Sequence, residues 1–483
     1  MIQDKSRQLI NWETVSVNPN DKKWDWKDLF CFWAVSIQSL IGFSLIASLY
    51  LIYDLNFYVV LIGGILASLL ASLFSILIGT PSQKHGLPFP VILRSSMGVV
   101  GAKYIALIRG SVGIFMFGVQ TFFISKAIGY LIRIAIFSIN NEILENEIFL
   151  TFFMGMNLVD IISFIFTLYI QFHLFSKGHH FVRSVIKFST YFVYFGLSIF
   201  LIMITENYDE VSKLVSLTLE FDNFFLKENI TPLITVTGTM FAFFSIIILN
   251  FGDFSRYVKD KDQMIKGNLS LILNFVIFSF FSVLIVLGAD IILAKNMIEV
   301  DRLLTNPNDI IGKINNTALT VFTIIFIIVA SCSTNLIANY IPSQNVLINF
   351  LPKKLNLNST GFIIILISFF VGLFWLPIFS KVGILSIVDT LGSFFGPIFG
   401  VIIADYFIIK NSKISNKDIY SLNTDSLYFY SNGWHIKCLY SVFIGFIFAA
   451  STIWNVNLVF LQSFSWIIGA TTAFIIYYLL TTK

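Results

Sequence analysis

The chain has little charge and few cysteines, and each shortage excludes a class of protein. Only 12% of the 483 residues are charged, 57% are hydrophobic, and the mean hydropathy is +0.84. Soluble domains are about 45–50% apolar, so this composition excludes a soluble globular protein. The three cysteines, Cys31, Cys332 and Cys438, show no paired spacing, which excludes a metal knuckle or a redox dithiol. The sequence also lacks a glycine-rich phosphate loop and a metal-ligand cluster.

Long apolar stretches recur along the chain and predict an all-α polytopic membrane protein. A helix needs about 20 apolar residues to cross the hydrocarbon core, and barrel-type alternation is missing. We expect twelve transmembrane helices: Leu29–Tyr53, Phe57–Gly79, Tyr104–Ile134, Leu158–Phe175, Ser184–Ile204, Pro232–Phe254, Asn268–Leu293, Thr317–Ile341, Gly361–Ser380, Gly383–Ile409, Cys438–Trp454 and Leu458–Leu480. The polar opening has no signal-peptide pattern, so we expect a cytoplasmic tail there.

The distribution of charge between the loops predicts the orientation. If the N-terminus is cytoplasmic, every inside loop is basic, as the positive-inside rule requires. These basic residues are Lys84, Arg94, Lys103, Lys177, Arg183, Lys187, Arg256, Lys259, Lys261, Lys266, Lys353 and Lys354. The outside loops carry Glu142, Glu145, Glu147, Glu206, Asp209, Glu210, Glu220, Asp222 and Glu228. Both termini are then cytoplasmic, in a protein of the plasma membrane.

A run of small and polar residues from Ala330 to Asn339 interrupts the eighth span. Ala330, Ser333, Thr334 and Ile337 recur at helical spacing, so one face carries two hydroxyls. Polar groups at this depth are costly unless they bind each other or a ligand. The face can supply oxygen ligands to a small hard cation. The alternative is tight helix packing, in which such residues are also common.

Three other spans carry unusual polar or aromatic residues. A glutamine in the first span, Gln38, stands among serines and before Gly42, which suggests either a locally unwound helix or an ordinary interhelical hydrogen bond. Met116 and Gln120 share a face of the third span. The sixth span contains Phe244, which taken singly is more typical of packing, and runs into the polar string 250–257. That string suggests a capped helix end or a gate, with solvated loop chemistry as the alternative.

Several of these strings, taken in order, resemble the nucleobase–cation symporter-1 family. The likeness covers 34–38, 86–91 with Arg94 and Gly98, 117–121, 250–257, 333–339, 396–401 and 404–407. The resemblance implies a leucine-transporter-like fold, with spans one to five and six to ten as inverted repeats and spans one and six unwound. We therefore expect residues 1-28 to form a cytoplasmic tail and residues 29-410 to form the ten-helix transport core. Residues 411-483 would hold a cytoplasmic loop and two peripheral helices.

The resemblance also implies two sites. A sodium site carries over to Ala34 and Ile37 with Ala330, Ser333 and Thr334, whose neutral oxygens suit Na+. Substrate contacts carry over to Gln38, Gln120, Phe244 and Asn339, with Met116 and Phe243 beside them. Such amides pair with the N–H and C=O edges of an uncharged heterocycle. Many family members have tryptophans where this chain has Met116 and Phe244, so we expect a reshaped pocket.

The function implied is secondary active import of a nucleobase or related heterocycle, of the uracil, allantoin, hydantoin or cytosine class. Na+ is the expected coupling ion, with no other cofactor, no enzymatic activity and no nucleic-acid partner, in a monomer within the lipid bilayer. One alternative is a proton-coupled carrier of another heterocyclic nutrient or vitamin precursor, with Asp160, Asp290 and Asp405 as reserve carboxylates at the span ends. Lys126 is expected to reach the outer interface. An ion channel or an intramembrane enzyme fits less well, because mid-span ionisable groups and repeated pore loops are missing.

Overall fold

The computed structural model describes residues 8–52, 55–204, 227–295, 305, 317–381 and 389–482. In these residues the chain is helical, and pairing between extended segments is limited to isolated bridges such as Trp24 with Val258. The expected acidic residues Glu206, Asp209, Glu210, Glu220 and Asp222 lie outside the described residues. The same holds for Tyr53, for the start of the tenth span at Gly383, and for residues 1–7 of the expected tail.

The first half of the chain contains the helices of the first five expected spans. They are α1 (Trp26–Ile37), α2 (Leu40–Leu51), α3 (Phe57–His85), α4 (Phe89–Met97), α5 (Gly101–Ile139), α6 (Glu147–Leu150), α7 (Leu158–Phe175) and α8 (His179–Ile204). Of these, α4 and α6 are too short to cross a membrane. The remaining helices supply spans one to five, with α1 and α2 sharing the first.

The second half repeats this plan and adds a C-terminal hairpin. Its helices are α10 (Ile230–Ile248), α11 (Gly252–Ser255), α12 (Lys261–Lys295), α14 (Thr317–Asn335), α15 (Ile341–Phe350), α16 (Leu357–Leu373), α18 (Phe395–Ile403), α19 (Ile436–Trp454) and α20 (Ser465–Thr482). Three π-helical turns, Leu336–Tyr340, Trp375–Phe379 and Ala404–Ile409, continue α14, α16 and α18. A 3-10 segment, Val456–Phe464, joins α19 to α20.

Ten helices of the described chain are long and apolar enough to cross a membrane. The bent pair α1 and α2 makes one further span, and the shorter apolar helix α16 occupies the position of the ninth. These twelve positions match the twelve expected spans, which confirms the all-α polytopic fold.

The first span is broken between α1 and α2. Ser39 starts α2 as its N-cap, with its Oγ accepting a hydrogen bond from the Gly42 amide at 3.0 Å. Because this cap begins a new helix directly after Gln38, the two axes meet at 70°. The sixth span is interrupted between α10 and α11. The expected break is present within span one, whereas in the sixth span α10 is continuous from Ile230 to Ile248 and the interruption comes only after it.

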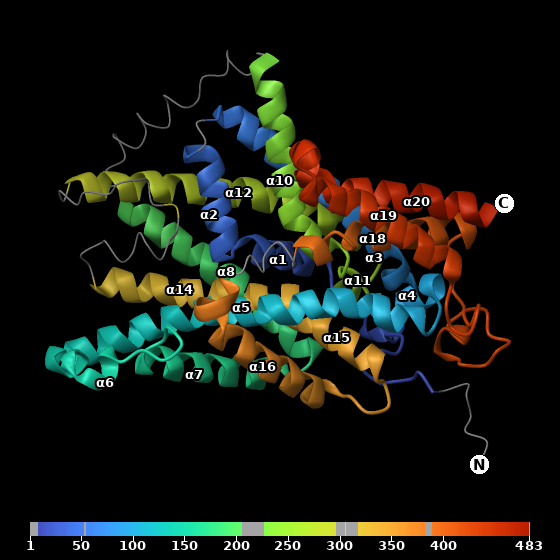
Figure 1. The fold of residues 1–483 in the computed structure, drawn as a ribbon. Coiled ribbons are helices and arrows are strands. Elements are labelled where there is room, and N and C mark those ends of the chain that lie inside the picture. The colour runs from blue at the N-terminus through green and yellow to red at the C-terminus, as the bar shows by residue number, and fades with distance from the viewer. Residues whose placement is uncertain are drawn as a thin grey trace.

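Most of the helices pack as two sets, and α8 packs against helices of both, namely α1, α12 and α14 (Figure 1). In the first set, which we call the α3 set, α3 packs against α10, α11 and α12, and α12 packs against α1. In the second, the α5 set, α5 packs against α7, α14, α15 and α16. Direct contacts between the two sets, such as those of α1 with α14, are fewer than the contacts within each set.

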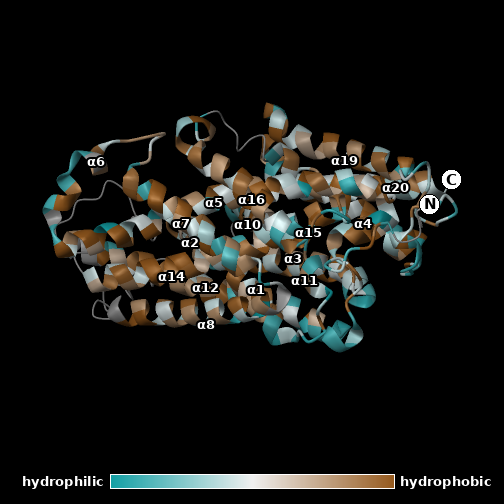
Figure 2. Ribbon diagram, turned by 90° about the horizontal axis from the view of Figure 1, so that it is seen from below, coloured by the Kyte–Doolittle hydropathy of each residue, from teal (hydrophilic) through white to brown (hydrophobic). Residues whose placement is uncertain are grey.

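Both ends of the described chain lie at one end of the molecule. The first described residues, α4 and the end of α20 are together there, and α6 with its acidic residues is at the opposite end (Figure 1). Hydrophilic segments gather at these two ends, and apolar helices fill the middle (Figure 2). This arrangement agrees with a chain whose termini are on the same side of a bilayer.

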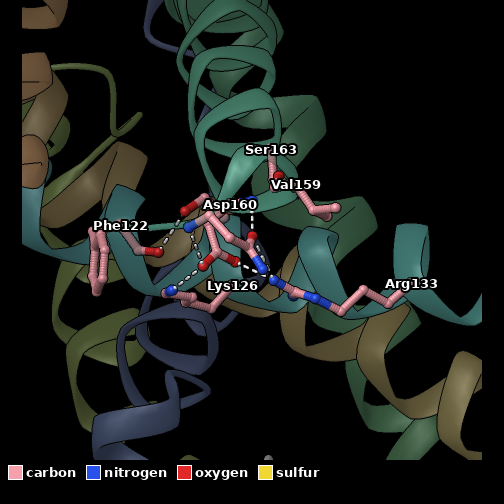
Figure 3. A network of polar contacts seen from close by, with 8 residues as sticks. Phe122, Lys126, Arg133, Val159, Asp160 and Ser163 are labelled. Carbon is pink, nitrogen blue, oxygen red and sulfur yellow. Dashed lines mark hydrogen bonds and ion pairs between the residues drawn. The ribbon is translucent and has the colours of Figure 1, made fainter. Parts of the chain in front are cut away.

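A buried ion-pair network joins α5 to α7. The Asp160 carboxylate, which also belongs to the capping box that starts α7, accepts from Lys126 Nζ and from Arg133 Nη2, each at 2.7 Å (Figure 3). Lys126 was expected to reach the interface and Asp160 to be solvated at a span end. The prediction that water solvates the Asp160 carboxylate is wrong, because Asp160 is only 4% exposed.

Asp405 is also buried rather than solvated. It accepts from Lys410 Nζ and, at 2.6 Å, from the hydroxyl of Tyr477 on α20. Arg94, expected in an inside loop, is fully buried on α4 and donates to Asn349 Oδ1 at 2.7 Å and to the Ile419 carbonyl at 3.2 Å. In each case a hydrophilic partner contributed by a distant segment makes the burial tolerable.

Candidate functional site

A cavity of about 460 Å³ lies between the two helix sets and the C-terminal hairpin. From the α5 set it is lined by Met116 and Gln120, and from the eighth span by Thr334 and Asn339. Phe243 of α10 faces it from the α3 set. Five of the residues that the sequence predicts for the substrate or sodium site therefore line a single cavity. A volume of this size is typical of small-molecule sites.

A relay of amides fixes the hydrogen-bonding polarity of the cavity wall. Asn335 Nδ2 donates to the Phe117 carbonyl at 3.3 Å and to Thr121 Oγ1 at 3.1 Å. Since a backbone carbonyl can only accept, the amide of Asn335 can be placed only with its nitrogen on that side. Its Oδ1 therefore faces Asn339, whose Nδ2 donates to it at 2.9 Å.

The relay ends at the cavity with one donor and one acceptor. Asn339 Nδ2 gives its second hydrogen to Gln120 Oε1 at 2.9 Å, so both of its hydrogens are used. Asn339 Oδ1 and Gln120 Nε2 make no hydrogen bond to another residue in the described part of the chain. These two groups, on residues that line the cavity, can accept from an N–H and donate to a C=O of one ligand.

The aromatic residues of the sixth span divide between the cavity and the packing behind it. Phe243 lines the cavity, and Phe244 is fully buried behind it, with ring centroids 5.5 Å apart. Met116 faces the same cavity from α5. The cavity surface at these positions is therefore one thioether and one phenyl ring.

Gln38 lies outside the central cavity. It is 3% exposed and lines a separate cavity of about 60 Å³ between α2, α8, α12 and α14. Its side-chain amide makes no hydrogen bond within the described residues, although the Tyr194 hydroxyl lies near it. Ser39, the next residue, lines both cavities, so the break between α1 and α2 separates them.

The residues expected to bind sodium lie on two helices in contact, Ala34 and Ile37 on α1 and the other three on α14, and Thr334 reaches α1 at Val35. Thr334 Oγ1 lies 2.7 Å from the Val35 carbonyl and 3.0 Å from the Ala330 carbonyl and can donate its one proton to either, and Ser333 Oγ donates to the Ala330 carbonyl at 2.9 Å. All five are buried, none more than 5% exposed. The donor set is made of carbonyls and hydroxyls without a carboxylate, which fits a monovalent hard cation.

The C-terminal hairpin contributes to the cavity wall. Gln462, Ser463 and Trp466 line it. Trp466 packs in an aromatic cluster with Phe74, at a centroid distance of 5.6 Å, and with Phe399, at 4.9 Å. The sequence reasoning treated this hairpin as peripheral and missed Trp466, because nothing local distinguishes it from other aromatics in apolar spans.

The relay itself was also missed in part. Asn335 and Thr121 lie within strings quoted for the family resemblance, yet neither was assigned a role. The four-residue spacing of Asn335 and Asn339 puts both on one helix face, whereas Thr121 and Gln120 are consecutive and do not share a face. Only the contact between α5 and α14 shows that the amides join into one chain of hydrogen bonds.

Comparison with solved structures shows the class of the fold. The structure of Mhp1, a nucleobase-cation-symport-1 family transporter with bromovinylhydantoin bound, superposes with a TM-score of 0.72 at 16% identity, covering 98% of this chain and 95% of that chain. A Na+-coupled sialic acid symporter superposes with a TM-score of 0.66 at 13% identity, covering 96% and 91%. The fold is thus that of the leucine-transporter-like membrane transporters, with its five-plus-five inverted repeat.

Sequence relatives define the family within that class. A family model described as "Permease for cytosine/purines, uracil, thiamine, allantoin" matches residues 16–480. The allantoin permease of Bacillus subtilis is 27% identical over 99% of this chain and 94% of its own length. The purine-uracil permease NCS1 of Arabidopsis thaliana is 24% identical over 91% and 70%. The chain belongs to the nucleobase–cation symporter-1 family of permeases, which confirms the expected family and the expectation of a transporter rather than an enzyme.

Proposed function

We propose that this permease imports an uncharged nucleobase or related N-heterocycle by Na+ symport through alternating access. The observation that carries the substrate class is the donor and acceptor pair at the end of the amide relay. Gln120 Nε2 and Asn339 Oδ1 match an edge on which N–H stands beside C=O, as in uracil, hydantoin or allantoin. No charged side chain is needed for this pairing.

Apolar contacts complete the proposed substrate site. Phe243 supplies a π-face and Met116 a polarizable thioether on the cavity surface, which together can hold a flat ring. Phe244 supports Phe243 from behind. Gln38 would join the site by a rotation at the break beside Ser39, which already lines both cavities. We expect a pocket different in shape from one built on tryptophans.

For the coupling ion we propose Na+, held by Ala34 and Ile37 of α1 with Ala330, Ser333 and Thr334 of α14. Thr334 is the link between ion and substrate, because it lines the central cavity and bonds to the end of α1. An ion that holds α1 against α14 fixes the broken helix beside the cavity. Substrate and sodium would then each raise the affinity for the other.

Uptake into proteoliposomes tests both parts of this proposal. Radiolabelled uracil, allantoin, hydantoin and cytosine would be offered with and without an inward sodium gradient. We expect one of them to accumulate only with the gradient, and Thr334→Ala to weaken the sodium dependence more than the substrate preference. Asn339→Ala should abolish uptake, because it removes the acceptor and releases Gln120 and Asn335. Wild-type kinetics in both variants would refute the site assignment.

A proton-coupled carrier is the second candidate, supported by one observation. Asp389 is a carboxylate that lines the central cavity. Uptake driven by an inward proton gradient in sodium-free buffer, and lost in Asp389→Asn, would favour this candidate. Retained, sodium-dependent uptake in Asp389→Asn would favour the first.

The remaining expectations are also part of the proposal. We expect a monomer in the plasma membrane with both termini cytoplasmic, a tail of residues 1-28, a transport core of residues 29-410, and residues 411-483 as the C-terminal part. The basic loops at the end that carries the termini support this orientation. Protease digestion of sealed right-side-out vesicles, with tags at each end, tests it.

A further inference from the structure

A buried arginine lies directly beyond the central cavity, on the side of the termini. Arg109 of α5 is fully buried, and its Nη2 donates to the Ala338 carbonyl at 2.6 Å and to the Ile246 carbonyl at 3.5 Å. Its guanidinium lies 5.5 Å from the ring centroid of Phe395. Ala338, Ile246 and Phe395 all line the central cavity, so Arg109 lies behind its floor.

The position of Arg109 along α5 gives the direction. It precedes Met116 by seven residues, which is about 10 Å of helix, towards the end at which α4 and the termini lie (Figure 1). On that side, a second cavity of about 40 Å³ is lined by Asp253, Arg256 and Asn345 among others. Arg109 therefore stands between the central cavity and this second one.

Only one of the three guanidinium nitrogens of Arg109 makes hydrogen bonds within the described residues. Its Nε and Nη1 have no partner in the described part of the chain, and no carboxylate there lies within ion-pair distance of it. Arg94 is equally buried, but its Nε and both terminal nitrogens donate to Asn349, Leu9 or Ile419. A buried charge without an ion-pair partner is costly, which argues for a role beyond packing.

Asp253 of α11 is the carboxylate whose charge acts on Arg109. It is 1% exposed and accepts from the Phe89 amide at 3.1 Å and from Asn250 Nδ2 at 3.3 Å. It makes no ion pair among the described residues, and the cations in whose field it lies are Arg256, three residues along the chain, and Arg109. In a buried, low-dielectric setting such an attraction acts beyond contact distance.

Arg109 also crosses the boundary between the two helix sets. It belongs to the α5 set, as does Ala338 in the turn after α14, whereas Ile246 on α10 and Asp253 on α11 belong to the α3 set. We propose that Arg109 is a clasp: it holds the central cavity closed toward the termini, and its attraction to Asp253 opposes separation of the two sets there. It is a positioning residue, because it does not itself line the central cavity.

Cysteine accessibility tests the clasp without any substrate. Single cysteines introduced as Thr239→Cys, on the central cavity, and Gln344→Cys, on the second cavity, would be labelled with a hydrophilic maleimide in purified protein. We expect Arg109→Gln to slow labelling at 239 and to speed labelling at 344, each by about tenfold. Asp253→Asn should shift both rates in the same direction, and the double variant should shift them no further than the larger single effect.

Arg133→Gln is the matched control. Arg133 is on the same helix, but its ion pair with Asp160 lies within the α5 set (Figure 3). Its loss should lower stability and leave the ratio of the two labelling rates unchanged. Unchanged rates in folded Arg109→Gln, or fully additive effects in the double variant, would overturn the clasp. If Arg109→Gln does not elute as a monodisperse protein, unchanged rates in Asp253→Asn would overturn it instead. Because no ligand is added, these outcomes are independent of whether the proposed sodium symport is correct.

Discussion

Replacement of Asp160 by asparagine removes the centre of the ion-pair network between α5 and α7. Two cations, Lys126 and Arg133, each lie 2.7 Å from this carboxylate, whose side chain is 5% exposed (Figure 3). In Asp160→Asn both cations lose their counter-charge, and one of them faces an amide NH2, a donor, in place of a carboxylate oxygen. The expected effect is a loss of stability without a change in the cavity, which Asp160 does not line.

The magnitude follows from the burial of the two partners. Removing one member of a buried ion pair costs about 3–5 kcal/mol. Each cation is 27% exposed and can be partly rehydrated, so we expect the free energy of unfolding to fall by about 3 kcal/mol. In a chain of 483 residues that corresponds to a fall in unfolding temperature of about 3 °C.

The cysteines of the chain provide the assay. Cys31 and Cys438 are buried, so a thiol-reactive dye reports their exposure as the protein unfolds in detergent. The matched control is Asp290→Asn on α12, because in the described part of the structure Asp290 makes no ion pair. If the two variants unfold within a degree of each other, the network does not stabilise the fold and the reasoning fails.

Three further predictions concern other parts of the molecule. Gly400→Ala should destabilise the protein, since a Cβ there would come within 2.0 Å of the Ala470 carbonyl oxygen, whereas Gly392→Ala meets nothing within 4 Å; equal unfolding temperatures would contradict this. Burial lowers the pKa of His435 below its ordinary 6.5, so the unfolded chain binds the proton more readily than the folded protein. The wild type should therefore lose stability as the pH falls from 7 to 5, and His435→Gln should lose less. A parallel pH dependence of the two unfolding temperatures would exclude that role. Gln38→Leu should abolish uptake if the amide reaches the substrate, while uptake that survives, measured in the proteoliposome assay, would restrict Gln38 to the side cavity.

The sequence predicts the spans well because each depends on local composition. An apolar run of sufficient length is helical in a bilayer whatever surrounds it, and a serine cap after Gln38 is enough to restart a helix. The run from Ala330 to Asn339 likewise predicts a polar helix face from its own residues alone. Residues of this kind, Thr334 and Asn339 among them, reach the central cavity.

Pairings across the fold are what the sequence leaves open. Asp160 reads as a span-end carboxylate until α5 brings Lys126 and Arg133 to it. Arg94 reads as a loop charge until Asn349, 255 residues away, accepts its hydrogen bonds. The polarity of the Gln120 and Asn339 pair is decided by a carbonyl at Phe117, and no pattern along one helix contains that information.

The close approach of α18 to α20 bears on how far the chain can be shortened. Gly396 and Gly400 let the two backbones touch at Trp466 and Ala470, and the same hairpin walls the central cavity. Cutting the chain after the tenth helix would leave an open flank through which lipid tails reach the polar interior. The smallest unit able to keep its interior sealed is then the full set of twelve helices.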